Sequence, residues 1–162
     1  MLVTGVGSIG SELVRQLVLK NKVFILDHDE AFFDLLEELK QKGFDISGKL
    51  GDIRDERVLE DIPRPDTIFH CAALKYVPPA ESAPLEYVKT NILGTANVLN
   101  YAVRYSIPMI NISTDKVVNA ESIMGLTKKI AEKMVSAAKK NSVRFGNVMG
   151  SKGSVIPIWQ RQ

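Results

Sequence analysis

A hydroxyl, a carboxylic acid and an amine stand side by side at Thr114, Asp115 and Lys116. They directly follow Ile110–Ser113, an apolar run that predicts a strand. In an open α/β sheet, ligands bind at the edge formed by the carboxyl ends of the strands. An acid and an amine at that edge can exchange protons with a substrate, provided that burial or a neighbouring cation such as Lys128 lowers the pKa of the amine. The alternative is an ordinary salt pair in a loop.

A glycine-rich turn near the N-terminus has the pattern of a phosphate-binding loop. Gly5-Val6-Gly7-Ser8-Ile9-Gly10 follows the apolar run Leu2–Thr4 and precedes a segment with helical spacing. The first glycine allows a tight turn, the second lets the backbone approach a pyrophosphate, and the third lets the helix pack on the strand. The helix N-terminus also attracts the anion.

An acidic residue follows this turn at the distance expected for a dinucleotide site. Asp27 lies about twenty residues beyond the glycines, where a carboxylate can accept a hydrogen bond from an adenosine ribose hydroxyl. The same charge would repel a 2′-phosphate, so NAD is favoured over NADP, although His28 beside it can soften the preference. The alternative is a glycine-rich turn of another α/β fold, with Asp27 capping the next helix.

Strands and helices are predicted to alternate along the chain. The apolar runs that predict strands are Leu2–Thr4, Val23–Leu26, one ending before Gly51, Thr67–Ala72, Pro108–Ser113 and Val143–Phe145. Helical spacing predicts helices over residues 11–20, over 32–39 with Gly43 ending the helix, from Pro84 to Val103, and a last one ending near Asn141 with Ile130, Met134 and Ala138 inward. Continuous apolar strands joined by helices are typical of parallel sheets covered on both faces. We therefore expect an α/β, doubly wound parallel sheet of the Rossmann type, with three α/β/α layers.

Composition excludes several classes of protein. The chain has 162 residues, with 21 basic against 19 acidic side chains. Because these charges nearly cancel, the chain lacks the positive electrostatic field that attracts nucleic acid. No apolar run is long enough to cross a membrane, and the first residues lack the features of a secretion signal. The lone Cys71 and two histidines form no metal set, and a single cysteine indicates a reducing, cytoplasmic location. We expect one NAD(P)-binding domain over residues 1–162, part of a longer protein.

Several further motifs resemble those of a known family. These are Gly51–Asp55, His70–Lys75, Lys89–Thr95, Ser113–Lys116, Met124–Lys128 and Arg144–Ser151. With the glycine turn, they resemble the extended short-chain dehydrogenase/reductase family. The last three look like its nucleotide-sugar 4,6-dehydratase branch of polysaccharide biosynthesis, whose best-known activity acts on UDP-N-acetylglucosamine.

The resemblance implies a reaction and roles for the polar residues. A hydride leaves C4 of the sugar for the cofactor, the C5 proton and the C6 hydroxyl are lost as water, and the hydride returns to C6. Thr114 is implied to bond the oxygen at C4, Asp115 to protonate the leaving hydroxyl and Lys116 to remove the C5 proton. Lys128 is implied to hold the nicotinamide ribose, while Met124 stands where the wider family has a tyrosine.

The resemblance also implies a set of binding residues. Those expected at the cofactor are Gly5, Gly7, Ser8, Ile9, Gly10, Asp27, His28, Asp52, Ile53, Ala72, Ala73, Lys75, Asn91 and Lys128, and those expected at the UDP-sugar are Lys75 and Asn147. Asn91 is expected to bond backbone and hold the strand before Thr114. The glycine turn is one residue shorter than in most members, and the C-terminal part that would grip the UDP-sugar is largely missing.

Two other functions fit the same residues. A UDP-sugar 4-epimerase shares the hydride chemistry but needs no acid and base for C5 and C6. A dinucleotide-binding module without turnover is the alternative from another class. Relatives form dimers or larger rings, so a homo-oligomer is also expected.

Overall fold

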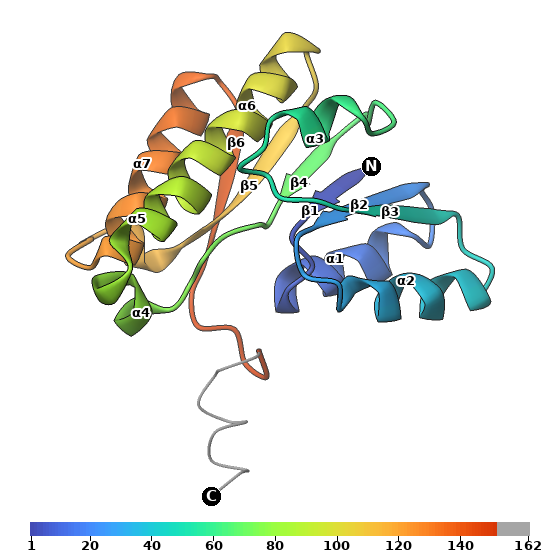
Figure 1. The fold of residues 1–162 in the computed structure, drawn as a ribbon, viewed down its shortest axis with the longest axis horizontal. Coiled ribbons are helices and arrows are strands. Elements are labelled where there is room, and N and C mark those ends of the chain that lie inside the picture. Colours follow the sequence, from blue (N-terminus) through green and yellow to red (C-terminus); the bar gives the residue numbers. More distant parts are fainter. Residues whose placement is uncertain (152–162) are drawn as a thin grey trace, which may run out of the picture.

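Six parallel strands form one sheet in the computed structural model, which describes residues 1–151 (Figure 1). The strand order is β3-β2-β1-β4-β5-β6. The strands are β1 Leu2–Thr4, β2 Val23–Asp27, β3 Ile46–Leu50, β4 Ile68–His70, β5 Met109–Thr114 and β6 Asn141–Phe145. Successive strands run outward on one side of β1 and then on the other, which makes a topological switch point between β1 and β4.

Helices cover both faces of this sheet. They are α1 Ser8–Leu17, α2 Phe32–Gln41, α3 Arg57–Glu60, α4 Val77–Ser82, α5 Pro84–Tyr87, the π-helical η1 Val88–Gly94, α6 Thr95–Arg104, the 3₁₀ turn η2 Asp115–Val117 and α7 Ile123–Ala137. On one face, α1 and α2 pack on β1, β2 and β3 through residues such as Val14 and Leu36. On the other, α3, α6 and α7 pack on β1, β4 and β5 through residues such as Leu59 and Val98. The predicted doubly wound, three-layer α/β fold is confirmed (Figure 1).

Most predicted elements lie where the sequence places them, because their signals are local. Gly43 follows α2 with a φ of 84°, a left-handed conformation that glycine adopts without strain. The helix predicted from Pro84 to Val103 is interrupted by the π-helical η1, which adds a residue to a turn. A π-helical turn of this kind is frequent at functional sites, and η1 contains Asn91.

The inward face of the last helix is a correction. Met134 and Ala138 pack against the core as expected, although both are only partly buried. Ile130, however, is 46% exposed, and the fully buried residues of α7 include Met124, Ala131 and Val135. Ser122 is the N-cap of α7, and its side chain accepts a hydrogen bond from the Gly125 N–H.

Two further expectations concern a C-terminal apolar stretch and helices that could cross a membrane. The apolar stretch Ile156–Trp159, which suggests another packed element, lies outside the described residues. Over residues 1–151, no helix combines the length and the apolar character that crossing a bilayer requires.

Candidate functional site

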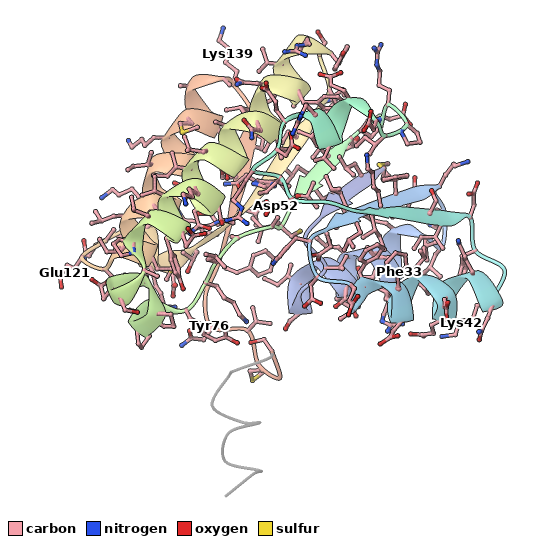
Figure 2. All side chains as sticks on the ribbon, viewed as in Figure 1. Phe33, Lys42, Asp52, Tyr76, Glu121 and Lys139 are labelled. Atoms are coloured by element: carbon pink, nitrogen blue, oxygen red, sulfur yellow. The ribbon has the colours of Figure 1, made fainter. Side chains whose placement is uncertain are left out.

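One large cleft opens at the carboxyl ends of the strands. Its volume is about 1370 Å³, more than the 300–1,000 Å³ or so of a small-molecule pocket. The expected site residues that line it are Gly5, Gly7, Ser8, Ile9, Gly10, Asp27, His28, Asp52, Ile53, Ala72, Ala73, Lys75, Thr114, Lys116, Met124, Lys128 and Asn147. Asp52 and Tyr76, labelled in Figure 2, both belong to its lining. The structure therefore brings most of the predicted cofactor and reacting residues together in one cleft, with Asp115 and Asn91 as exceptions.

Two glycines of the turn are required by close packing, and a third leaves open space. Gly5 has a φ of 77°, and a Cβ on it would lie 2.4 Å from the Ala72 Cα atom. A Cβ on Gly10 would lie 1.9 Å from the Gly5 carbonyl oxygen. Gly7, in contrast, has no atom within 4 Å of the position of a Cβ, so this glycine leaves open space above the N-terminus of α1. Gly5 and Gly10 serve the fold, and Gly7 faces the cleft.

We expect alanine at two of these glycines to have opposite effects. Gly10→Ala should destabilise the fold by roughly 3 kcal/mol, because its Cβ overlaps backbone. Gly7→Ala should change stability by less than about 0.5 kcal/mol but weaken NAD binding at least roughly tenfold, because the methyl occupies space left for a pyrophosphate. Urea unfolding and calorimetry measure the two quantities. Equal unfolding midpoints for the two variants would contradict this assignment.

Asp27 ties the glycine turn to the end of β2. Its carboxylate accepts hydrogen bonds from the Val6 N–H at 2.5 Å and from the Asp29 N–H at 3.0 Å. The ring Nδ1 of His28 lies 3.3 Å from the same carboxylate. Capping of the turn before α2 falls instead to Asp29, which accepts from the Ala31 N–H. The carboxylate therefore has a structural role here while still lining the cleft.

The turn after β3 is held from two directions. Asp52 accepts hydrogen bonds from the backbone and side chain of Arg54, and Arg54 also donates to Glu86 at 2.8 Å. Burial alone would raise the pKa of Asp52, but these bonds outweigh it and lower the pKa. Asn97 on α6 donates to the Ile53 carbonyl at 2.9 Å, and the Ile53 side chain is buried in the core. The backbone of this turn is thus fixed against the cleft.

The two titratable residues at the end of β4, His70 and Cys71, do not gain or lose a proton near neutral pH. His70 lies between the hydroxyls of Thr4 and Thr95, at 2.7 and 2.9 Å, and burial together with the charge of Lys128 lowers its pKa to about 3. Burial raises the pKa of the Cys71 thiol to about 12. The interpretation of both as structural residues is confirmed, and the small Ala72 and Ala73 that follow leave the cleft open.

Thr114, Asp115 and Lys116 form a hydrogen-bonded group at the end of β5. The Thr114 hydroxyl donates to the Asp115 carboxylate at 3.1 Å, and the Lys116 Nζ lies 3.6 Å from that carboxylate. Lys116 also donates to the Asn147 side-chain oxygen at 3.4 Å. Thr114, Lys116 and Asn147, the last expected at the UDP-sugar, thus line one cleft.

Two expectations about this group do not hold in the structure. Asp115 is exposed and is not among the cleft-lining residues, and the bond from Thr114 lowers its pKa, which favours the carboxylate over the acid. Of the two surroundings expected to activate Lys116, burial or a neighbouring cation, burial is not found, since its side chain is 44% exposed. Both differ because the strand ends at Thr114, so the two residues that follow turn along the rim.

Lys128 is the buried amine of the cleft. It is 6% exposed and donates a hydrogen bond to the Ile112 carbonyl at 2.7 Å. Burial lowers its pKa to about 8, although Cys71 and Glu132 act in the opposite direction. Met124, one turn earlier on α7, is 2% exposed, packs with Ala80 and Tyr87, and lines the same cleft. It is thus both a core residue and part of the cleft wall.

Asn91 holds a different segment from the one expected. It does not line the cleft: its amide donates to the Leu74 carbonyl and accepts from the Leu74 N–H, both near 2.9 Å, and also donates to Thr127. The expected backbone bonding is confirmed, but the strand before Thr114 is not its partner. The buried Asn91 amide therefore connects the loop at Leu74 to α7, and we call this connection the brace.

We expect Asn91→Ala to unfold at lower urea, with a loss of roughly 2 kcal/mol, because it removes the partner of the partly buried N–H and carbonyl of Leu74. Asn100→Ala, an exposed position on α6, is the matched control and should change stability by less than about 0.5 kcal/mol. A loss at Asn91 as small as at Asn100 would contradict the brace.

Sequence reasoning missed some of the lining. Arg15 on α1 and Glu38 on α2 line the cleft and form an ion pair at 2.7 Å. They are 23 residues apart, and nothing local in the sequence links them. Only the packing of α1 beside α2 brings them together.

The chain is similar to proteins of surface polysaccharide synthesis. Over residues 1–162 it matches the family described as Polysaccharide biosynthesis protein. It is 38% identical to the capsular polysaccharide biosynthesis protein CapD of Staphylococcus aureus, over all of this chain and 30% of that protein. It is 36% identical to the UDP-glucose 4-epimerase of Rickettsia typhi, over all of this chain and 52% of that protein. The chain thus spans about half the length, or less, of these relatives.

Solved structures show the same fold. Pen from Bacillus thuringiensis is 36% identical with a TM-score of 0.93, over 99% of this chain and 55% of that one. A dTDP-glucose 4,6-dehydratase double mutant from Streptomyces venezuelae, solved with NAD bound, has a TM-score of 0.83 over 98% of this chain and 60% of that one. At 23% identity it shows the fold alone. Because the family match runs the whole length of the chain, the chain belongs to the polysaccharide biosynthesis protein family, within the extended short-chain dehydrogenase/reductase nucleotide-sugar enzymes.

Proposed function

We propose that this chain is the cofactor-binding part of an NAD-dependent nucleotide-sugar 4,6-dehydratase that acts on UDP-N-acetylglucosamine or a close UDP-sugar. The observation that carries this proposal is the position of Lys116 and Thr114 at the rim of the cleft that also holds the glycine turn and Lys128. An amine beside a hydroxyl at the switch point is what removal of a proton next to a ketone requires.

The residues present fit a dinucleotide. Gly7 leaves open space at the N-terminus of α1, and the carboxylate of Asp27 lines the cleft at the end of β2. Asp29, Asp34 and Glu38 also line that end, so the acidic side chains there favour NAD over a cofactor with a 2′-phosphate. When bound, NAD would accept a hydride from the sugar and return it.

The chain's own residues would handle the protons. The Thr114 hydroxyl would donate to the oxygen at C4, and the Lys116 amine would remove the C5 proton. Lys128, as an ammonium, would bind the nicotinamide ribose and stabilise developing negative charge. Asp115 stays the proposed acid for the C6 hydroxyl, which requires its carboxyl group to turn from Thr114 toward the substrate.

A UDP-sugar 4-epimerase is the second candidate, favoured by the identity to the Rickettsia typhi enzyme. The test is to incubate the complete protein with NAD and UDP-N-acetylglucosamine, and to analyse the sugar by mass spectrometry and NMR. Loss of one water supports the dehydratase, and an unchanged mass with inverted C4 supports the epimerase. NADP in place of NAD should give less product. Binding of NAD with an unaltered sugar would favour a module without turnover.

The open cleft has a consequence for this chain by itself. We expect the 162-residue chain to bind NAD weakly and to leave UDP-sugars unaltered, because a wide, open cleft orients a sugar poorly. The expected homo-oligomer and the cytoplasmic location stay predictions, which sedimentation and cell fractionation of the complete protein can test.

A further inference from the structure

One carboxylate outside the cleft joins three separate segments of the site. Glu132 on α7 accepts a hydrogen bond from the Ser113 hydroxyl of β5 at 2.8 Å. The Arg144 guanidinium of β6 donates to both of its oxygens, through Nε at 3.0 Å and through Nη2 at 2.5 Å. A two-pronged bond from arginine fixes direction as well as distance. The Glu132 side chain is only 18% exposed whereas that of Arg144 is 51% exposed, so the carboxylate, unlike the guanidinium, is largely shielded from water.

Each of the three joined segments carries a proposed reacting residue. Ser113 directly precedes Thr114, and Arg144 pairs with Ser113 in the register of β5 and β6. Glu132 lies four residues, about one helical turn, after Lys128. Asn147, the partner of Lys116, follows Arg144 by three residues. A shift of any one segment would therefore change the distances between Lys128, Lys116 and the sugar.

The same carboxylate also acts on the charge of Lys128. The groups that face Lys128 are His70 and Cys71 from the end of β4 and Glu132 from its own helix. His70 is neutral and Cys71 is held as a thiol, since burial lowers the pKa of the first and raises that of the second. Glu132 is thus the neighbour in this set that is ionised at neutral pH, because the bonds from Arg144 lower its pKa.

We propose that Glu132 is a positioning residue, which locks α7 to the ends of β5 and β6 and supplies the counter-charge of the Lys128 ammonium. The proposal rests on the proposed function for its catalytic meaning. Its structural part rests on the contacts of Glu132 with Ser113 and Arg144, and its electrostatic part on the position of Glu132 about one helical turn from Lys128. Both can be measured without turnover.

Two single variants separate the electrostatic role from a purely structural one. Glu132→Gln and Arg144→Gln break the same pair, but the first removes a negative charge near Lys128 and the second a positive one. We expect the pKa of Lys128 to fall by about half a unit or more in Glu132→Gln and to stay or rise in Arg144→Gln. Titration of ¹⁵N-lysine by NMR measures this, with the signal assigned by its absence in Lys128→Met. Equal shifts in the two variants, or no shift in Glu132→Gln, would overturn the proposal.

Turnover of the complete protein tests the positioning. Glu132→Gln should lower kcat by roughly tenfold to a hundredfold, because small misplacements of reacting groups are costly, and should move the basic limb of the pH–rate profile to lower pH. Glu60→Gln is the matched control: Glu60 also accepts from an arginine and a hydroxyl, Arg104 and Tyr105, but far from the cleft. It should leave kcat and the profile unchanged. A similar loss in both variants would overturn the role.

These experiments distinguish a failure of the proposed function from a failure of the inference about Glu132. If wild-type protein neither dehydrates nor epimerises a UDP-sugar, the proposed function fails, while the NMR titration still decides whether Glu132 sets the charge of Lys128. If wild-type turnover is present and the Lys128 pKa is the same in Glu132→Gln, only the inference about Glu132 fails.

Discussion

Lys116→Ala in the complete protein is expected to lower dehydration by about a thousandfold, within the range that a general base contributes. The amine lies at the rim of the cleft, 3.4 Å from the Asn147 side chain, and no other amine is proposed for the C5 proton. Stability should change by less than about 1 kcal/mol, because the side chain is 44% exposed and its ion pair with Asp115 is screened by water. Formation of the 4-keto product, followed by mass spectrometry, gives the rate.

A matched control separates the base from general effects of charge. Lys129→Ala removes an exposed lysine of α7 beside Lys128, and it should retain full activity. An epimerase would also keep most of its activity in Lys116→Ala, since inversion at C4 needs no base at C5. Retention of more than about a tenth of wild-type dehydration in Lys116→Ala would mean that another group removes the proton.

Lys128→Met is expected to stabilise the fold while it abolishes turnover. Burial lowers the pKa of Lys128 from 10.5 to about 8, so below pH 8 the folded protein holds a charge that the unfolded chain solvates better. This difference corresponds to a cost of about 3 kcal/mol at neutral pH, which a methionine of similar length does not carry. Higher stability together with lost turnover is expected when a residue is needed for activity but destabilises the fold.

The sign of the pH dependence is fixed by the same shift. Between about pH 8 and 10.5 the unfolded chain binds more protons at this lysine than the folded one, so wild-type stability rises relative to Lys128→Met. The stability gap should be largest below pH 8 and nearly closed by about pH 10.5. Urea unfolding of both proteins at several pH values measures it, with Lys133→Met at an exposed position as control. A gap that is independent of pH would contradict a charged, buried Lys128.

The parts of this protein that the sequence could predict are those with local causes. The order of strands and helices follows from short apolar runs and helical spacing, and Gly5, Gly10 and Gly43 mark turns that need their backbone freedom or their lack of a Cβ. Because parallel strands end at one edge of a sheet, the same patterns predicted that the glycine turn and Thr114 would share a cleft.

The residues whose positions were predicted wrongly are those whose neighbours come from distant segments of the chain. Ile130 was expected inside but is exposed, because the side of α7 that packs on the sheet carries Ala131 and Val135. Asn91 bonds Leu74 and Thr127 and does not bond the strand before Thr114. Asp115 stands outside the cleft lining, because direction after a strand end depends on the turn that follows.

The sequence was enough to predict the doubly wound fold and the edge at which the chemistry must lie, since each strand and helix has a local signal and their alternation favours one parallel sheet. Only the tertiary structure decided which lysine is buried, which carboxylate faces it, and how Asp27 holds the Val6 N–H. Burial and electrostatic coupling depend on distances in space, and residues such as Ser113, Glu132 and Arg144 become neighbours only when the helix packs on the sheet.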